Sequence, residues 1–144
     1  MPNRIEMFSR VERQYFRDRL GTLGLQPLDG LIIRQLGREG HLKQEELACK
    51  IAVDKGAVAR SLARLEEQGL VQRQVSDQCR REKRVSLTSQ GREMLAVVQQ
   101  VMREWNDISY RGFSQEERAL YEAFLTRITD NVMQFRRGEE RDHG

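Results

Sequence analysis

The 144-residue sequence has few prolines, few cysteines and no long hydrophobic run, and each shortage excludes a class of protein. With only 2 prolines, long uninterrupted helices are permitted. No apolar stretch reaches the ~18 residues that a membrane-spanning helix needs, so no membrane association is expected. The first residues carry charge throughout and lack the apolar segment of a signal peptide, which indicates a cytoplasmic protein.

Catalytic and metal-binding patterns are also lacking. His41 and His143 are isolated, and the sequence contains no HExxH, GxSxG or P-loop motif. No metal, no cofactor and no enzymatic activity are therefore predicted. Cys49 and Cys79 do not have CxxC spacing and are expected to be reduced thiols, while redox sensing through Cys79 or Cys49 stays open as the alternative.

What the sequence does have is charge and helical periodicity. Charged residues make up 33% of the chain and hydrophobic residues 38%, which is typical of a helix-rich domain. The net charge of +3 is too small to indicate an anionic partner by itself. The argument for function therefore depends on where the basic residues lie.

Apolar spacing predicts six helices and one hairpin. The helices are expected at about 5–20, 27–36, 43–51, 54–68, 88–113 and 114–137, and the strands at 69–77 and 83–89. Asp54 and Thr88 are expected to cap the helices that follow them, and Ser114 with Glu117 forms a capping box. The charged tail after Arg137 is expected to fray.

The helix at 54–68 presents small and basic residues once its apolar stripe, Val58, Leu62 and Leu65, is turned inward. The outward positions are expected to be Lys55, Gly56, Ala57, Arg60, Ser61 and Arg64. A shorter helix and a short turn precede this helix, which matches the spacing of a helix–turn–helix, whose second helix enters the DNA major groove. A solvated helix face would show the same residues. The basic hairpin that follows favours DNA binding through Arg80, Arg81, Lys83 and Arg84.

Three segments resemble the MarR family of winged helix–turn–helix transcriptional regulators, over about residues 8–135. They are LGLQPLDGLIIRQL, QEELACKIAVDKGAVARSLARLEEQGLVQR and the wing end RRxxxVSLTxxG. The resemblance implies a mainly α fold with a small β-hairpin wing, and a homodimer that binds pseudo-palindromic double-stranded operator DNA. It also implies that DNA is released when a small aromatic or lipophilic effector binds, or when a cysteine is oxidised.

The resemblance also implies a set of DNA contacts. Gln44 would lie near phosphate, Arg73 would hold the phosphate backbone, and Arg81 would enter the minor groove beside Arg80 at the wing tip, which Lys83 follows. The major groove would receive Lys55, Gly56, Ala57, Arg60 and Ser61. Arg64 either joins them or pairs with Glu66 or Glu67 on its own helix. The chain departs from the family pattern at Lys43, where a Ser or Thr cap is usual, and at Cys79, where an Asp is usual.

The organisation expected for residues 1–144 is one domain, with a winged helix–turn–helix lobe at 27–88 and dimerisation helices at 1–24 and 89–138. The long helices have wider apolar faces than one small domain needs, so a homodimer is predicted, and a self-contained bundle is the alternative. An effector pocket is expected between these helices and the lobe, with Arg13 pairing with a carboxylate and Phe16 and Ile33 as apolar walls. A solvated Arg13 is the competing interpretation.

The predicted function is thus that of a DNA-binding transcriptional regulator, a repressor whose DNA affinity falls when an aromatic-acid effector binds. A winged helix used only for protein contacts is the alternative from another class, and the basic face of the 54–68 helix disfavours it.

Overall fold

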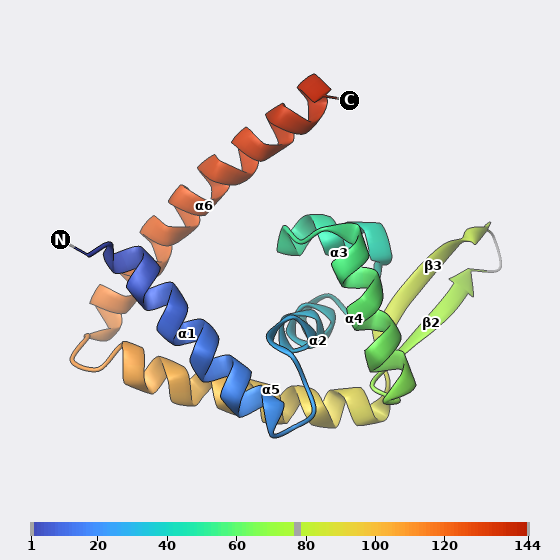
Figure 1. Ribbon diagram of the computed structural model, residues 1–144, viewed down its shortest axis with the longest axis horizontal. Helices are drawn as coiled ribbons and strands as arrows, with labels where there is room; N and C mark the ends of the chain where they lie inside the picture. Colours follow the sequence, from blue (N-terminus) through green and yellow to red (C-terminus); the bar gives the residue numbers. More distant parts are fainter. Residues whose placement is uncertain (1, 77–78, 144) are drawn as a thin grey trace. The chain divides into compact units, whose positions relative to one another are not determined.

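The computed structural model of the chain describes residues 2–76 and 79–143, without the side chains of residues 75, 76, 79–83 and 143. In chain order (Figure 1) the elements are α1 (Arg4–Gly21), α2 (Pro27–Glu39), β1 (His41–Lys43), α3 (Gln44–Ile51), α4 (Lys55–Glu67), β2 (Val71–Ser76), β3 (Cys79–Leu87), α5 (Ser89–Ser109) and α6 (Gln115–His143). The predicted mainly α fold with a small β wing is confirmed, and the strand β1 adds to the predicted elements.

The chain divides into two compact units, Met1–Glu104 and Trp105–Gly144. The first unit holds every element from α1 to β3 and most of α5. The second unit holds the end of α5 and α6. The candidate DNA-binding elements therefore all belong to the first unit.

The core of the first unit gathers the apolar stripes of its helices around α2. Ile32, Ile33 and Leu36 of α2 are almost fully buried, and so are Leu62 and Leu65 of α4. Burying each large aliphatic side chain contributes roughly 1.5–3 kcal/mol, against the entropy lost when the chain folds. α3 and α4 lie side by side, and the hairpin of β2 and β3 extends from the end of α4 (Figure 1).

The sheet has three antiparallel strands in the order β1-β3-β2. Val71 of β2 pairs with Leu87 of β3, and Leu42 of β1 pairs with Val85 of β3. All four side chains are buried, so the root of the hairpin is part of the core. The sequence did not predict β1 because three residues are too short for a periodic signal, and because its partner lies more than 40 positions along the chain.

The predicted helix caps are confirmed. The Ala57 N–H donates to Asp54 Oδ1 at 2.9 Å, and the Gly91 N–H donates to Thr88 Oγ1 at 3.0 Å. Ser114 and Glu117 each bond the other's backbone N–H, which is the predicted capping box. These bonds satisfy donors that a helix leaves open in its first turn, and so fix where α4, α5 and α6 begin.

The second unit is dominated by α6, which continues to His143. The expectation that the chain frays after Arg137 is therefore wrong. An ion pair one helical turn apart, with Arg136 Nε 3.7 Å from Glu140 Oε1, supports the helix in this region. Large apolar side chains of α6 are exposed, among them Ile128 at 60% and Phe135 at 70%. Among the described residues, none of the helices combines the length and the apolar character needed to cross a membrane.

Candidate nucleic-acid interface

A tight turn joins α3 to α4. Ala52 ends α3 with a positive φ of 57°, a left-handed conformation that L-residues seldom adopt and that a small side chain tolerates. The Val53 N–H donates to the carbonyl of Ala48, and Asp54 then caps α4. The turn fixes α4 against α3 in a helix–turn–helix, and α4 occupies the position of the recognition helix.

The first half of α4 presents its small and basic residues to solvent. Lys55, Gly56 and Arg60 are exposed, and Ala57 is half-buried. A Cβ at Gly56 would lie 3.2 Å from an Arg60 guanidinium nitrogen, so the Arg60 side chain extends back over Gly56 towards the helix N-terminus. In the described part of the chain, Lys55 and Arg60 have no ion pair that would compete with a phosphate or a base.

Two residues expected on this outward face turn inward. Ser61 is fully buried and its hydroxyl donates to Asp29 Oδ1 on α2, so the expectation that Ser61 faces outward is wrong. Arg64 does not pair with Glu66 or Glu67, and instead its Nη2 lies 2.9 Å from Asp29 Oδ1 and 3.1 Å from Gln26 Oε1. The outward face is therefore shorter than the sequence predicted.

The other predicted phosphate contacts lie at the edges of α4. Gln44 is half-buried at the first position of α3, and the cap residue Lys43 does not cap the helix through its side chain. Arg73 of β2 lies with Nε 3.2 Å from Glu66 Oε2, without hydrogen-bond geometry, and this buried Nε has no hydrogen-bond partner among the residues that the structure describes. To bind a DNA phosphate, Arg73 would have to leave Glu66 or contact Glu66 and the phosphate together.

The wing carries the remaining predicted contacts. The backbone of β3 includes Arg80, Arg81 and Lys83, whose side chains, like that of Cys79, lie outside the described residues. At the root of the wing Arg84 is described, and its Nη1 lies 2.8 Å from His41 Nδ1 on β1. This contact attaches a basic residue of β3 to the edge strand that the sequence did not predict.

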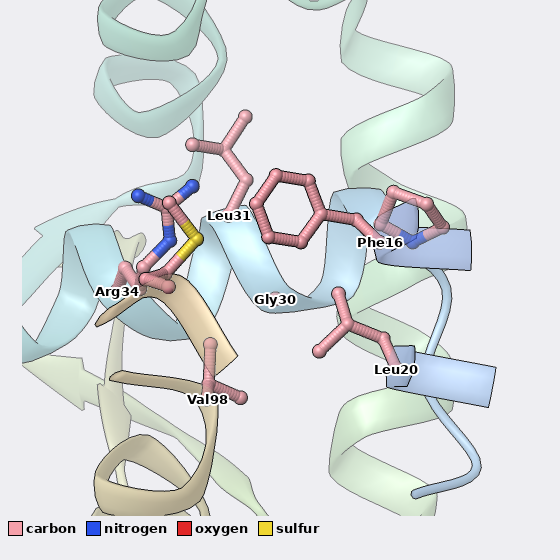
Figure 2. Close-up of a pocket in the computed structure, with 8 residues that line it drawn as sticks. Phe16, Leu20, Gly30, Leu31, Arg34 and Val98 are labelled. Carbon is pink, nitrogen blue, oxygen red and sulfur yellow. The ribbon is translucent and has the colours of Figure 1, made fainter. Parts of the chain in front are cut away.

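A small cavity of about 50 Å³ lies between α1, α2 and α5 within the first unit. Figure 2 shows Phe16 of α1 and Arg34 of α2 on opposite sides of it, with Leu20 and Val98 also lining the space. Of the residues predicted for an effector pocket, Phe16 lines this cavity. Arg13 is exposed on α1 and Ile33 is fully buried in the core, and neither lines the cavity.

Arg34 is the cation at this cavity. Burial lowers its pKa from the ordinary value of arginine, and the neighbouring positive charge of Arg38 adds to this, while Glu12 opposes it. The charged guanidinium is thus poorly solvated, and a bound anion would relieve that cost. The sequence contains one signal for Arg34, which is a charged residue between the apolar Ile33 and Leu36.

Cys49 is exposed on α3 with a free thiol. No group of three His, Cys, Asp or Glu side chains in the described part of the chain is placed to hold a metal ion.

Comparisons with known proteins place this geometry among DNA-binding regulators. The sequence profile described as the MarR family matches residues 25–83. The HTH-type transcriptional regulator YybA of Bacillus subtilis (strain 168) is 28% identical over 104 residues, which is 69% of each chain. A crystal structure of MarR superposes with a TM-score of 0.80 at 30% identity over 94% of both chains. That of the transcriptional regulator SlyA gives a TM-score of 0.83 at 26% identity, over 90% of this chain and 92% of the other.

Proposed function

Since this chain belongs to the MarR family of DNA-binding transcriptional regulators, we propose that it acts as a repressor, binding a pseudo-palindromic operator as a homodimer. The observation that carries the proposal is the exposed first half of α4, where Lys55 and Arg60 stand beside Gly56 and Ala57 without intramolecular ion pairs among the described residues. Lys and Arg contact phosphates and guanine edges, and small residues let a helix approach the groove closely.

The remaining contacts proposed for this interface flank α4. Gln44 begins α3, and Arg73 follows α4 on β2, so both lie near the groove edges when α4 occupies the groove. Arg80, Arg81 and Lys83 of the wing are proposed for the flanking DNA, with Arg81 in the minor groove. Ala57 can contact a thymine methyl group but provides no hydrogen bond, so Arg60 carries most of the proposed base recognition.

The test of DNA binding is its dependence on salt. A duplex is first selected from a random-sequence pool with the purified protein, and its affinity is compared with that of a random duplex of equal length. Release of counterions predicts a steep fall in affinity between low and moderate salt, and tighter binding of the selected duplex. An affinity that stays flat with salt, or a pool without enriched sequences, would contradict the proposed function.

The exposed apolar residues support the homodimer. α6 exposes Leu120, Tyr121, Phe124, Leu125, Ile128, Val132 and Phe135, and α1 exposes Ile5, Phe8 and Val11. Monomeric proteins seldom expose so many large apolar side chains on neighbouring helical turns. A second copy of the chain would cover them and would also bring a second α4 to the other half of a palindromic site.

A second proposal concerns an effector. The cavity beside Phe16 and Arg34 combines apolar walls with a poorly solvated cation, which suits a small aromatic carboxylate. At about 50 Å³ the cavity has room for only a few water molecules, so such a ligand must push its walls apart. This displacement gives the ligand a way to alter α2, which packs against α4.

Salicylate is a suitable probe, with uncharged benzyl alcohol as its control. Salicylate is expected to lower the affinity of the wild-type protein for the selected duplex, and benzyl alcohol is not. Arg34→Gln should abolish the salicylate effect, whereas Arg38→Gln, which changes an exposed arginine one turn further along α2, should keep it. An equal salicylate effect in the wild type and Arg34→Gln would exclude Arg34 as the carboxylate partner.

A further inference from the structure

Asp29 is a carboxylate buried at the start of α2, with 1% of its surface exposed. Its Oδ2 accepts the Gln26 N–H at 2.8 Å, as expected near a helix N-terminus. Its Oδ1 accepts two further bonds, from the Ser61 hydroxyl and from Arg64 Nη2, both on α4. A buried carboxylate is costly unless it is paired and hydrogen-bonded, and this one has both kinds of partner.

The two bonds to α4 differ in kind from the other contacts of that helix. Apart from the bond of Arg64 to Gln26 and the pair of Glu66 with Arg73, α4 packs on the core through aliphatic side chains, those of Val58, Leu62 and Leu65. Apolar contacts are not directional, so they determine which face of α4 is buried but set no bond angles. Hydrogen bonds have defined lengths and angles, so the bonds of Ser61 and Arg64 to Asp29 fix the rotation of α4 relative to α2.

Arg64 is held in place by its bonds to residues at the start of α2. Its Nη2 bonds to both Asp29 and Gln26, and its Nε is buried without a hydrogen-bond partner in the described residues. Arg60, one turn earlier on the same helix, is exposed. If Arg64 turned out to DNA, the buried carboxylate of Asp29 would lose the one cation that pairs with it in the described part of the chain.

We propose that Asp29 is a positioning residue for DNA recognition: it holds α4 through Ser61 and Arg64 so that Lys55 and Arg60 meet the groove, and Arg64 does not contact DNA. The proposal rests on the proposed role of α4 as the recognition helix. It assigns the specificity of the protein partly to a carboxylate that is not exposed to DNA.

Three variants test this, on the selected duplex and a random duplex over a range of salt. Asp29→Asn keeps the side-chain shape but loses the negative charge that pairs with Arg64, and its one amide oxygen cannot replace both Oδ1 and Oδ2. Ser61→Ala removes a hydroxyl that is too deeply buried to touch DNA, and Arg64→Ala removes the cation. Each variant is expected to lower the ratio of the affinity for the selected duplex to the affinity for the random duplex. The expected decrease is roughly tenfold for Asp29→Asn and Arg64→Ala. The dependence of affinity on salt should stay as in the wild type, because no phosphate contact is lost.

The competing role, a direct contact of Arg64 with DNA, predicts different results. Arg64→Ala would then reduce the slope of log affinity against log salt concentration by about 1, the change expected for one lost phosphate contact. Asp29→Asn would leave the selected-to-random ratio unchanged or raise it, because it frees Arg64.

Thermal unfolding of each variant ensures that only folded proteins are compared. If Asp29→Asn does not fold, Ser61→Ala still decides, since a ratio equal to that of the wild type would overturn the positioning role. A failure of the proposed function gives a distinguishable result, because the wild type itself would then enrich no duplex and Arg60→Ala would change nothing.

Discussion

Arg60 and Arg64 lie one turn apart on α4, yet their surroundings differ. The Arg60 side chain is exposed and extends over Gly56. Arg64 instead bonds to Asp29 of α2 and to Gln26, the cap residue of α2. Spacing along the helix cannot separate the two, because residues four apart share a face. The separation comes from a carboxylate 35 positions earlier in the chain.

Arg60→Ala should therefore weaken binding of the selected duplex, by about 1–3 kcal/mol if Arg60 contacts a base. The random duplex should lose less, because base contacts matter only on the matching sequence. Fluorescence anisotropy with labelled duplexes measures both affinities. Arg111→Ala is the matched control, since it removes the same charge from an exposed arginine outside the helix–turn–helix. An equal loss on both duplexes would show that Arg60 holds only phosphate.

The contacts of Asp29 with Ser61 and Arg64 could not be predicted from the sequence. In α2 Asp29 precedes Ile32 and Ile33 by three and four positions, which places a charge on the buried face of an amphipathic helix. This signal was visible, but an Asp in the first turn of a helix is also explained by local capping. Its partners, Ser61 and Arg64, depend on how α2 and α4 pack, which local periodicity does not determine.

At the scale of the elements, the junction between the hairpin and α5 depends on a close backbone approach. A Cβ at Gly91 would lie 2.0 Å from the carbonyl oxygen of Leu70 and 3.2 Å from the Cβ of Leu87. The same carbonyl accepts the Thr88 N–H at 3.1 Å, and Thr88 caps α5 through Gly91. The absence of a side chain at Gly91 thus lets α5 start directly against the end of the wing.

Gly91→Ala should destabilise the fold by roughly 1–3 kcal/mol, because the methyl group must displace backbone atoms that cannot rotate away. Gly138→Ala on α6 is the control, since a Cβ there meets nothing within 4 Å and alanine favours a helix by about 1 kcal/mol. Chemical unfolding followed by circular dichroism, at one protein concentration, compares the two. A Gly91→Ala protein as stable as the wild type would mean that the approach at Leu70 relaxes at little cost.

The elements themselves were largely predictable because their signals are local. Asp54, Thr88 and the pair of Ser114 and Glu117 marked the starts of three helices, and each cap is present. β1 was missed since it is defined by pairing with β3 rather than by its own residues. The sequence does not predict that α6 extends past Arg137, because a run of charges is also typical of a frayed tail, although charges one turn apart support a helix.

At the scale of the whole molecule, the exposed apolar residues of α6 favour the proposed homodimer over a self-contained chain. Leu120, Phe124, Ile128 and Phe135 recur at helical spacing, and each is about half exposed or more. One chain leaves this stripe in water, at a cost that grows with the apolar area. A partner that covers it must have a complementary apolar stripe, and a second copy of α6 provides one by symmetry.

Ile128→Glu should therefore shift the protein towards monomer, because it places a charge in the middle of the stripe. Thr126→Glu is the matched control, since it adds the same charge to an exposed residue of α6 on the far side of the helix from the stripe. Light scattering after size exclusion, over a range of concentrations, gives the mass of each variant. The monomeric variant should also bind the selected palindrome far more weakly than the wild type while keeping its affinity for a single half-site, because only the pairing of two α4 helices is lost. If Ile128→Glu keeps the mass of the wild type, the stripe on α6 is not the dimer interface.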